Sequence, residues 1–242
     1  IIIMHMHILT RLTIKATLMD ERALYRLMTW LSPSFPVGAF AYSHGIEWAV
    51  EDGRVTDIET LNCWISDVVQ VGGGWSDAVL FSNAYDAGDD QNALVELNAL
   101  ACAMAPSSER YLEITAQGNA FVKAVLNAWA WDNAQAMCTA LKPDVAYPVI
   151  VAMAARGHGI QKDLALHAFI HASAANLVSA GVRLIPLGQS AGQHVMVKLE
   201  HAIESVTKMA GISDTSKIGG VAFLSDIAAM QHETQYSRLF RS

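Results

Sequence analysis

The segment that most resembles a catalytic motif is residues 188–192, Gly-Gln-Ser-Ala-Gly. It matches G-x-S-x-G, the turn that carries the nucleophilic serine of many hydrolases. Such a serine needs a base and an acid, and Asp226 and His232 are the candidate partners for Ser190. The motif also needs a strand before the turn and a parallel sheet beneath it, whereas the preceding residues have a helical pattern. A serine hydrolase is therefore kept as the alternative function.

A tight turn between two helices is the competing interpretation of the same residues. Gly188 and Gly192 allow such a turn, and Gln189, Ser190 and Gln193 would then satisfy backbone groups at the start of the second helix. The absence of an alternating strand–helix pattern favours this interpretation over the hydrolase. Gln189 and Gln193 are also candidates for a contact surface.

Pairs of histidines offer a second kind of chemistry, the binding of a metal ion. His167 and His171 lie four residues apart, so a helix would place both rings on one face. His5 and His7 form an H-x-H pair near the start of the sequence. Neither pair has a nearby Glu or Cys as a third ligand, and the glycines at 72–74 lack the Lys and Ser or Thr of a phosphate-binding loop. We therefore expect no bound metal, no cofactor and no catalytic set.

The composition is that of a poorly charged chain. Of 242 residues, 52% are hydrophobic and 16% are charged, against roughly 25% charged residues in an average soluble protein. The formal net charge is −7 and no cluster of Lys and Arg offsets it, which argues against nucleic-acid binding. A chain of this length with so little charge has a large apolar area to cover, in its own core or in a partner.

Three isolated cysteines, Cys63, Cys102 and Cys138, are typical of free thiols in a reducing compartment. The first residues show no basic region followed by a sustained apolar stretch, so we expect no signal peptide. The most membrane-like run, residues 164–187, contains histidines, an asparagine and an arginine, and a buried helix explains it better. These features predict a cytoplasmic protein without membrane association.

The elements that must position these residues are helices along most of the chain, with one weak strand signal at residues 182–186. Residues 32–38 contain two prolines and a glycine and separate the first two helices. Residues 56–59 form a capping-box pattern that begins the third helix, and the glycines at 72–74 end it. The other predicted helices span residues 20–31, 42–50, 76–87, 92–104, 108–129, 133–140, 147–156, 162–184, 192–209 and 220–232. The predicted architecture is all-α, a single-domain bundle of roughly ten helices.

The last eleven residues, 232–242, combine aromatic, basic and apolar side chains. Tyr and Arg dominate protein–protein hot spots because each joins a large contact area to directional hydrogen bonds. In a helix formed on binding, Tyr236 and Phe240 would lie four residues apart, with Glu233 and Arg241 at their rim. Two interpretations stay open here: the tail docks onto a partner, or it folds back onto its own domain.

Three segments of the sequence resemble the urease accessory protein UreF family. Residues 32–47, S-P-S-F-P-V-G-A-F-A-Y-S-H-G-I-E, look like its N-terminal signature, and residues 187–193, L-G-Q-S-A-G-Q, are similar to its L-G-Q-[ST]-x-G-Q turn. The ending H-E-T-Q-Y-S-R-L-F-R-S at 232–242 resembles its terminus letter for letter. Ala41 stands where many members have serine, which removes one hydroxyl at the entry to the next helix. From 71 to 155 the resemblance is one of helical character.

The resemblance implies an all-α scaffold that takes part in nickel delivery to urease and is not itself an enzyme. Members of the family form homodimers and bridge a UreD partner, also called UreH, to the GTPase UreG. That assembly inserts nickel into the urease apoprotein, coupled to GTP hydrolysis by UreG. Residues 1–19 lie outside the match and are expected to be a flexible extension before a UreF-like domain of residues 20–242.

The candidate partner-binding residues fall into three groups. The first is the tail at 232–242, which we expect to dock onto UreD. The second follows the proline-rich break at 32–38, and the third lies in the turn at 187–193. The residues are Tyr42, Glu47, Gln189, Gln193, Glu233, Gln235, Tyr236, Arg238, Leu239, Phe240 and Arg241.

Overall fold

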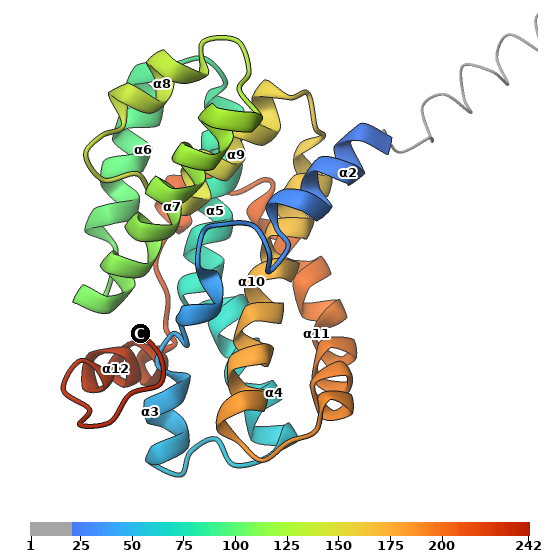
Figure 1. Cartoon of the computed structure of the whole chain (residues 1–242), viewed down its shortest axis with the longest axis vertical. Coiled ribbons are helices and arrows are strands. Elements are labelled where there is room, and N and C mark those ends of the chain that lie inside the picture. The colour runs from blue at the N-terminus through green and yellow to red at the C-terminus, as the bar shows by residue number, and fades with distance from the viewer. Residues whose placement is uncertain (1–20) are drawn as a thin grey trace, which may run out of the picture.

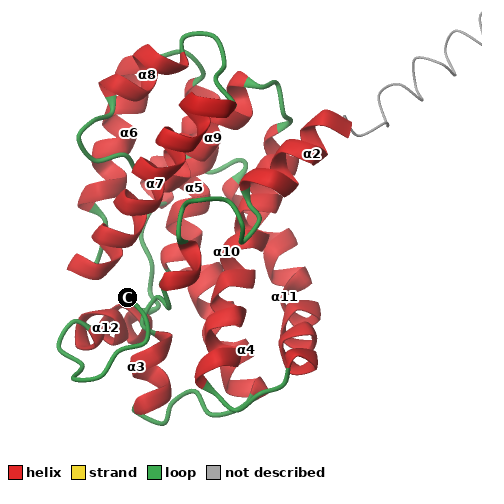
Figure 2. Ribbon diagram, in the orientation of Figure 1, coloured by secondary structure: helices red, strands yellow, loops and turns green. Residues whose placement is uncertain are grey.

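The computed structural model describes residues 21–242, which form helices and loops with no β-strand among them (Figure 2). The all-α, single-domain prediction is confirmed. The α-helices are α2 (Glu21–Trp30), α3 (Ile46–Glu51), α4 (Ile58–Val71), α5 (Gly73–Ala87), α6 (Gln91–Ala103), α7 (Ser108–Ala128), α8 (Ala134–Ala140), α9 (Tyr147–Gly157), α10 (Lys162–Leu184), α11 (Gln189–Ala210) and α12 (Phe223–His232), with short 3-10 turns η1 (Ala39–Ala41) and η2 (Thr215–Lys217). The expected extension at 1–19 and the pair His5 and His7 lie outside the described residues.

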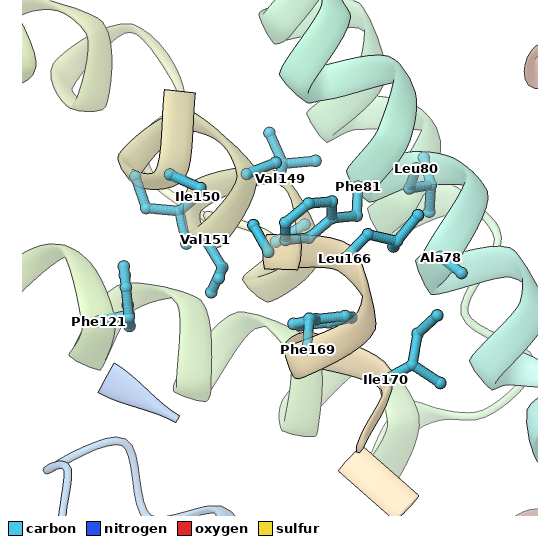
Figure 3. Packing of buried hydrophobic residues seen from close by; sticks show 14 of the residues in the cluster. Ala78, Leu80, Phe81, Phe121, Val149, Ile150, Val151, Leu166, Phe169 and Ile170 are labelled. Carbon is cyan, nitrogen blue, oxygen red and sulfur yellow. The ribbon is translucent and has the colours of Figure 1, made fainter. Parts of the chain in front are cut away.

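The core lies where α5, α9 and α10 meet. α9 packs between α5 and α7, and α10 packs against α11, α4 and α5 (Figure 1). Phe81 of α5 and Phe169 of α10 meet with their ring centroids 5.2 Å apart, close to Val149 and Ile150 of α9 (Figure 3). Burying one such large apolar side chain contributes about 1.5–3 kcal/mol. This core is therefore the main source of stability.

α10 contains most of the apolar run at residues 164–187, which is the most membrane-like segment of the sequence. The helix is long and apolar enough for one by length and composition, and half of its most apolar window is buried inside the bundle. Leu166, Phe169 and Ile170 are all buried in the core. The structure therefore agrees with the expected buried helix.

The start of α4 and the turn from α4 into α5 differ from the sequence prediction. The capping box of α4 is formed by Asp57 and Thr60, one residue later than predicted, because the Asp57 carboxylate accepts from the Thr60 N–H at 2.9 Å and the Thr60 hydroxyl accepts from the Asp57 N–H at 3.0 Å. Of the three glycines expected to end this helix, only Gly72 interrupts it. A Cβ at Gly74 would lie 2.9 Å from the Val69 Cα atom, so glycine here permits the close turn from α4 into α5.

Other boundaries shift by a few residues. Tyr42 lies between η1 and α3 rather than inside a helix. α11 begins at Gln189, three residues before its predicted start, and α12 begins at Phe223, three residues after its own. The weak strand signal falls mostly in the end of α10, and Ile185, the residue after the helix, is extended. The order of the helices along the chain is as predicted.

Candidate functional site

The arrangement of side chains on α12 is reversed with respect to an ordinary surface helix. Its outer face carries Phe223, Leu224, Ile227 and Met230, which are 46–64% exposed. Its buried side carries Ser225, Ala228, Ala229 and His232. A surface helix normally turns its large apolar residues toward the core. The outer face of α12 is therefore an apolar surface that the other described residues, 21–242, leave uncovered.

The small inner residues let α12 lie directly against α3 (Figure 1). A Cβ atom at Gly45 would lie 2.7 Å from the Ala229 backbone nitrogen and 3.1 Å from the Ala228 Cβ atom. Gly45 also has a φ of 78°, which favours glycine. The start of α3 and the middle of α12 are thus fixed against each other by backbone contact.

His232, at the end of α12, lies at the centre of a buried ionic cluster. Its Nδ1 atom is 2.7 Å from Glu109 Oε2 of α7, and its Nε2 atom is 3.0 Å from Glu47 Oε2 of α3. The His232 side chain is fully buried and both glutamates are nearly so. Each ring nitrogen thus has a carboxylate oxygen within hydrogen-bonding distance. These three residues tie α3, α7 and α12 together.

The tail at 233–242 folds back onto the same cluster. The Glu47 carboxylate accepts from the backbone N–H groups of Leu239, at 2.6 Å, and Phe240, at 2.9 Å. Arg238 donates to Glu109 at 2.9 Å. The Arg241 N–H donates to the Ala41 carbonyl at 2.8 Å. Ala41 thus holds the tail through its backbone.

The tail does not form the helix that would place Tyr236 and Phe240 on one face. Phe240 is buried, and the Arg183 guanidinium lies over its ring, 4.4 Å from the centroid. Tyr236 is fully exposed and Leu239 is 68% exposed. Phe240 therefore anchors the tail to its own domain, which corrects its expected role as an exposed anchor. Tyr236 and Leu239 are the large side chains that the tail presents.

Two other predicted contact residues are internal. Tyr42 and Glu47 are both buried, so they form no exposed second surface after the proline-rich break. Glu233 accepts from the Ser108 N–H at 2.9 Å and so binds the start of α7, and Gln235 donates to Glu51 of α3. Glu233 and Gln235 therefore hold the tail against its own domain.

Gln189 and Gln193 lie exposed on the first turns of α11. The N-cap of this helix is Gly188, and no side chain caps it. The capping role expected for Gln189, Ser190 and Gln193 is therefore absent. Both glutamines are open to contact from outside.

The hydrolase alternative loses its base in this structure. Ser190 is exposed on the first turn of α11, with a helix rather than a strand before it. Both ring nitrogens of His232 are occupied by Glu47 and Glu109, so neither is free to contact a serine hydroxyl. The histidine pair of α10 gains no third ligand, since residues 21–242 contain no group of three or more His, Cys, Asp or Glu side chains placed to hold a metal.

A second buried cluster lies beneath the last residue. Arg110 of α7 pairs with Asp77 at 3.0 Å and with Glu113 at 2.8 Å, and the Ser242 hydroxyl donates to Glu113 at 3.3 Å. Burial raises the pKa of Asp77. Burial, and then the Arg110 charge, lower the pKa of His44 to about 3, so this ring stays neutral.

Several residues of these two clusters were not predicted from the sequence. Glu109, Asp77, Arg110 and Glu113 look in the sequence like ordinary charges of α5 and α7. Only the fold shows that Glu109, Arg110 and Glu113 are buried and that Asp77 is half-buried. His232 was considered as a catalytic base, whereas the structure gives it a positioning role. The apolar spacing on α12 was visible, but the spacing does not say which side of the helix is covered.

Across the part of the chain that the structure describes, the fold is all-α and has an exposed apolar face, a feature typical of proteins that bind other proteins. A model of the UreF family matches residues 55–200. The urease accessory protein UreF of Rhodopseudomonas palustris strain BisB18 is 49% identical over 225 residues, covering 91% of this chain and 92% of that protein. That of Bradyrhizobium sp. strain BTAi1 is 48% identical over 231 residues, covering 93% and 95%. The chain belongs to the UreF family of urease accessory proteins.

Proposed function

We propose that this protein is a scaffold for urease maturation that docks onto UreD through the α12–tail surface, which we define as Phe223, Leu224, Ile227, Met230, Tyr236 and Leu239. The observation that carries the proposal is the reversed orientation of α12, with small residues inside and large apolar residues outside. Family membership supports the role in urease maturation. Docking explains why large side chains stay exposed in a chain that has an ample core.

The chemistry of this surface suits a stable protein interface. Large apolar and aromatic side chains at the centre, surrounded by charged groups, are the usual composition of a hot-spot region. A shallow groove between the start of α7 and the tail, with a volume of about 620 Å³, adds Leu112 and the exposed charges of Glu233 and Arg241. The Glu47 and Glu109 contacts fix the tail backbone, which lowers the ordering cost of binding.

In the proposed assembly the chain joins UreD to the GTPase UreG, and nickel, the cargo, enters the urease apoprotein with GTP hydrolysis on UreG. Gln189 and Gln193 of α11 are our candidates for a contact separate from the α12–tail surface, since both are exposed and neither caps the helix. A homodimer and a cytoplasmic location remain predictions of the same proposal. The protein itself supplies binding rather than catalysis.

The docking step is tested with the double variant Tyr236→Ala/Leu239→Ala in a pull-down of UreD. Both side chains are exposed, so the variant should fold with wild-type stability and lose UreD. Val197→Ser, at an equally exposed apolar position on α11, is the matched control and should bind normally. Capture of UreD at wild-type affinity by the double variant would end the docking proposal.

The bridging step is tested by co-expression of the chain with UreD and UreG, followed by sizing of the complex. We expect one assembly that contains all three proteins. Gln189→Ala/Gln193→Ala should retain UreD and weaken the recruitment of UreG. If the wild type and the double variant recruit UreG equally well, these glutamines are not part of the UreG contact.

A further inference from the structure

The linker between α11 and α12, residues 211–222, has little burial to hold it in place. None of these residues is buried, and Ile212 and Val221 are 90% and 65% exposed. Ile218 is the linker residue that packs part of its side chain against the core. Because so few apolar contacts fix this segment, its position depends on hydrogen bonds.

Side chains of α5 supply two of these hydrogen bonds. The Asn83 side-chain amide donates to the Ser213 carbonyl at 2.9 Å, and the Trp75 indole N–H donates to the Lys217 carbonyl at 2.8 Å. Trp75 and Asn83 lie eight residues apart, on one side of α5. Both acceptors are backbone carbonyls, so the two bonds hold the course of the linker whatever side chains it carries.

Two further contacts bring the linker to the start of α12. The Gly219 N–H donates to the Ser76 hydroxyl at 3.2 Å, and the Val221 N–H donates to the Val71 carbonyl at 2.8 Å. Because successive contacts move toward the start of α5, the linker runs antiparallel to this helix and ends beside the turn from α4 into α5. α12 begins there, at Phe223.

The two ends of α12 are therefore fixed by different contacts. Its last residue, His232, is bound by Glu47 and Glu109. Its first turn, with Phe223 and Leu224, follows the linker directly and has no side-chain cap. Phe223 and Leu224 are 64% and 55% exposed and belong to the α12–tail surface. The contacts between α5 and the linker thus determine where these two side chains lie.

We propose that Trp75 and Asn83 are positioning residues for partner docking: by holding the linker on α5, they keep Phe223 and Leu224 where UreD contacts them. This inference rests on the proposed function, and it adds residues that act through the linker rather than by contact. A docking surface held in its binding arrangement binds more tightly, because a larger fraction of the free protein is competent to bind.

The double variant Trp75→Phe/Asn83→Ala removes both donors and keeps an aromatic ring at position 75. Loss of the two hydrogen bonds should release the linker in most molecules, so UreD should bind about tenfold more weakly. Tyr85→Phe is the matched control, because the Tyr85 hydroxyl is another α5 donor to a backbone carbonyl, that of Ile160 at 2.6 Å. This control also loses a hydrogen bond but should bind UreD normally.

Hydrogen exchange provides a readout that needs no partner. The Gly219 and Val221 amides are bonded only while the linker lies in place, so they should exchange about tenfold faster in the double variant. The Phe240 amide, which Glu47 holds at the other end of the lobe, should keep its rate. Unchanged exchange at Gly219 and Val221 would show that the two α5 side chains do not hold the linker, and would overturn the inference.

The outcomes separate this inference from the docking proposal. If the double variant binds UreD within twofold of wild type while Tyr236→Ala/Leu239→Ala loses it, the positioning role is overturned and docking stands. Equal weakening by the double variant and by Tyr85→Phe also overturns it, because a general loss of stability then explains both. If the tail variant binds normally and the double variant does not, the tail contact fails and positioning through Phe223 and Leu224 stands.

Discussion

The central bundle and the lobe formed by α3, α12 and the tail follow opposite rules of burial. At the centre of the bundle, around Phe81 and Phe169, the buried side chains are apolar. In the lobe Glu47 and His232 are buried, together with Glu109 of the adjoining α7, whereas the large apolar side chains of α12 are exposed. The difference teaches that stability and binding are separated in this molecule. Burial in the bundle stabilises the fold, whereas the exposed apolar side chains of α12 contribute little to stability and are available for binding.

The largest effect on stability is expected in the bundle. Phe81→Ala removes a fully buried ring that packs on Phe169 and should lower the free energy of unfolding by about 3–5 kcal/mol. Phe223→Ala, on the outer face of α12, should change it by less than about 0.5 kcal/mol. Urea unfolding measures both. Similar losses at the two positions would contradict the separation of roles.

A smaller loss is expected when the polar interior of the lobe is broken. Glu47→Ala leaves the Nε2 atom of His232 and the amides of Leu239 and Phe240 without their partner and should cost about 3 kcal/mol. The tail should also become free, so trypsin should cut faster after Arg238 and Arg241. Glu51→Ala removes only an exposed contact to Gln235 and is the control. Unchanged cleavage in Glu47→Ala would show that this cluster does not hold the tail.

The free energy of unfolding should also depend on pH through the buried His44. Burial, and then Arg110, lower the pKa of His44 to about 3 from 6.5, so below pH 6.5 the unfolded chain binds a proton that the folded chain does not. Stability from this group is complete above pH 6.5 and falls as the pH drops toward 3. At about 1.4 kcal/mol per pH unit, the loss from pH 6.5 to pH 5 is about 2 kcal/mol.

The variant His44→Asn isolates this effect. Asparagine does not titrate and tolerates the φ of 55° found at this position, and both proteins retain the raised pKa of Asp77. Unfolding free energies at pH 6.5 and pH 5 should therefore change less in the variant than in the wild type. Equal slopes would mean that His44 is not held neutral.

Much of the bundle was predictable because helices leave local signals. α10 was predicted with its observed bounds, from its apolar spacing and the loop segments on each side of it. The lobe was less predictable because its contacts join distant residues. His232 and Glu109 meet across 123 positions of sequence, and nothing near either residue indicates the other. Sequence reasoning recognised the tail as exceptional but placed Phe240 outside, because a spacing of four describes a helix that the folded-back tail does not form.

The outer face of α12 shows why the site itself required the structure. The residues at 223, 224, 227 and 230 have the spacing of an ordinary amphipathic helix, which predicts that they face a core. The pattern identifies a face but not what covers it. The small residues on the opposite side, and the close approach of Gly45 to Ala229, turn that face outward.

The most direct test of the account combines stability and binding in one variant, Ile227→Ser/Met230→Ser. Both residues lie on the outer face of α12 and are about half exposed. We expect an unfolding free energy within about 1 kcal/mol of wild type and UreD affinity weakened by on the order of 100-fold, the loss of one or two hot-spot contacts. Binding of UreD at wild-type affinity by this folded variant would contradict the central claim.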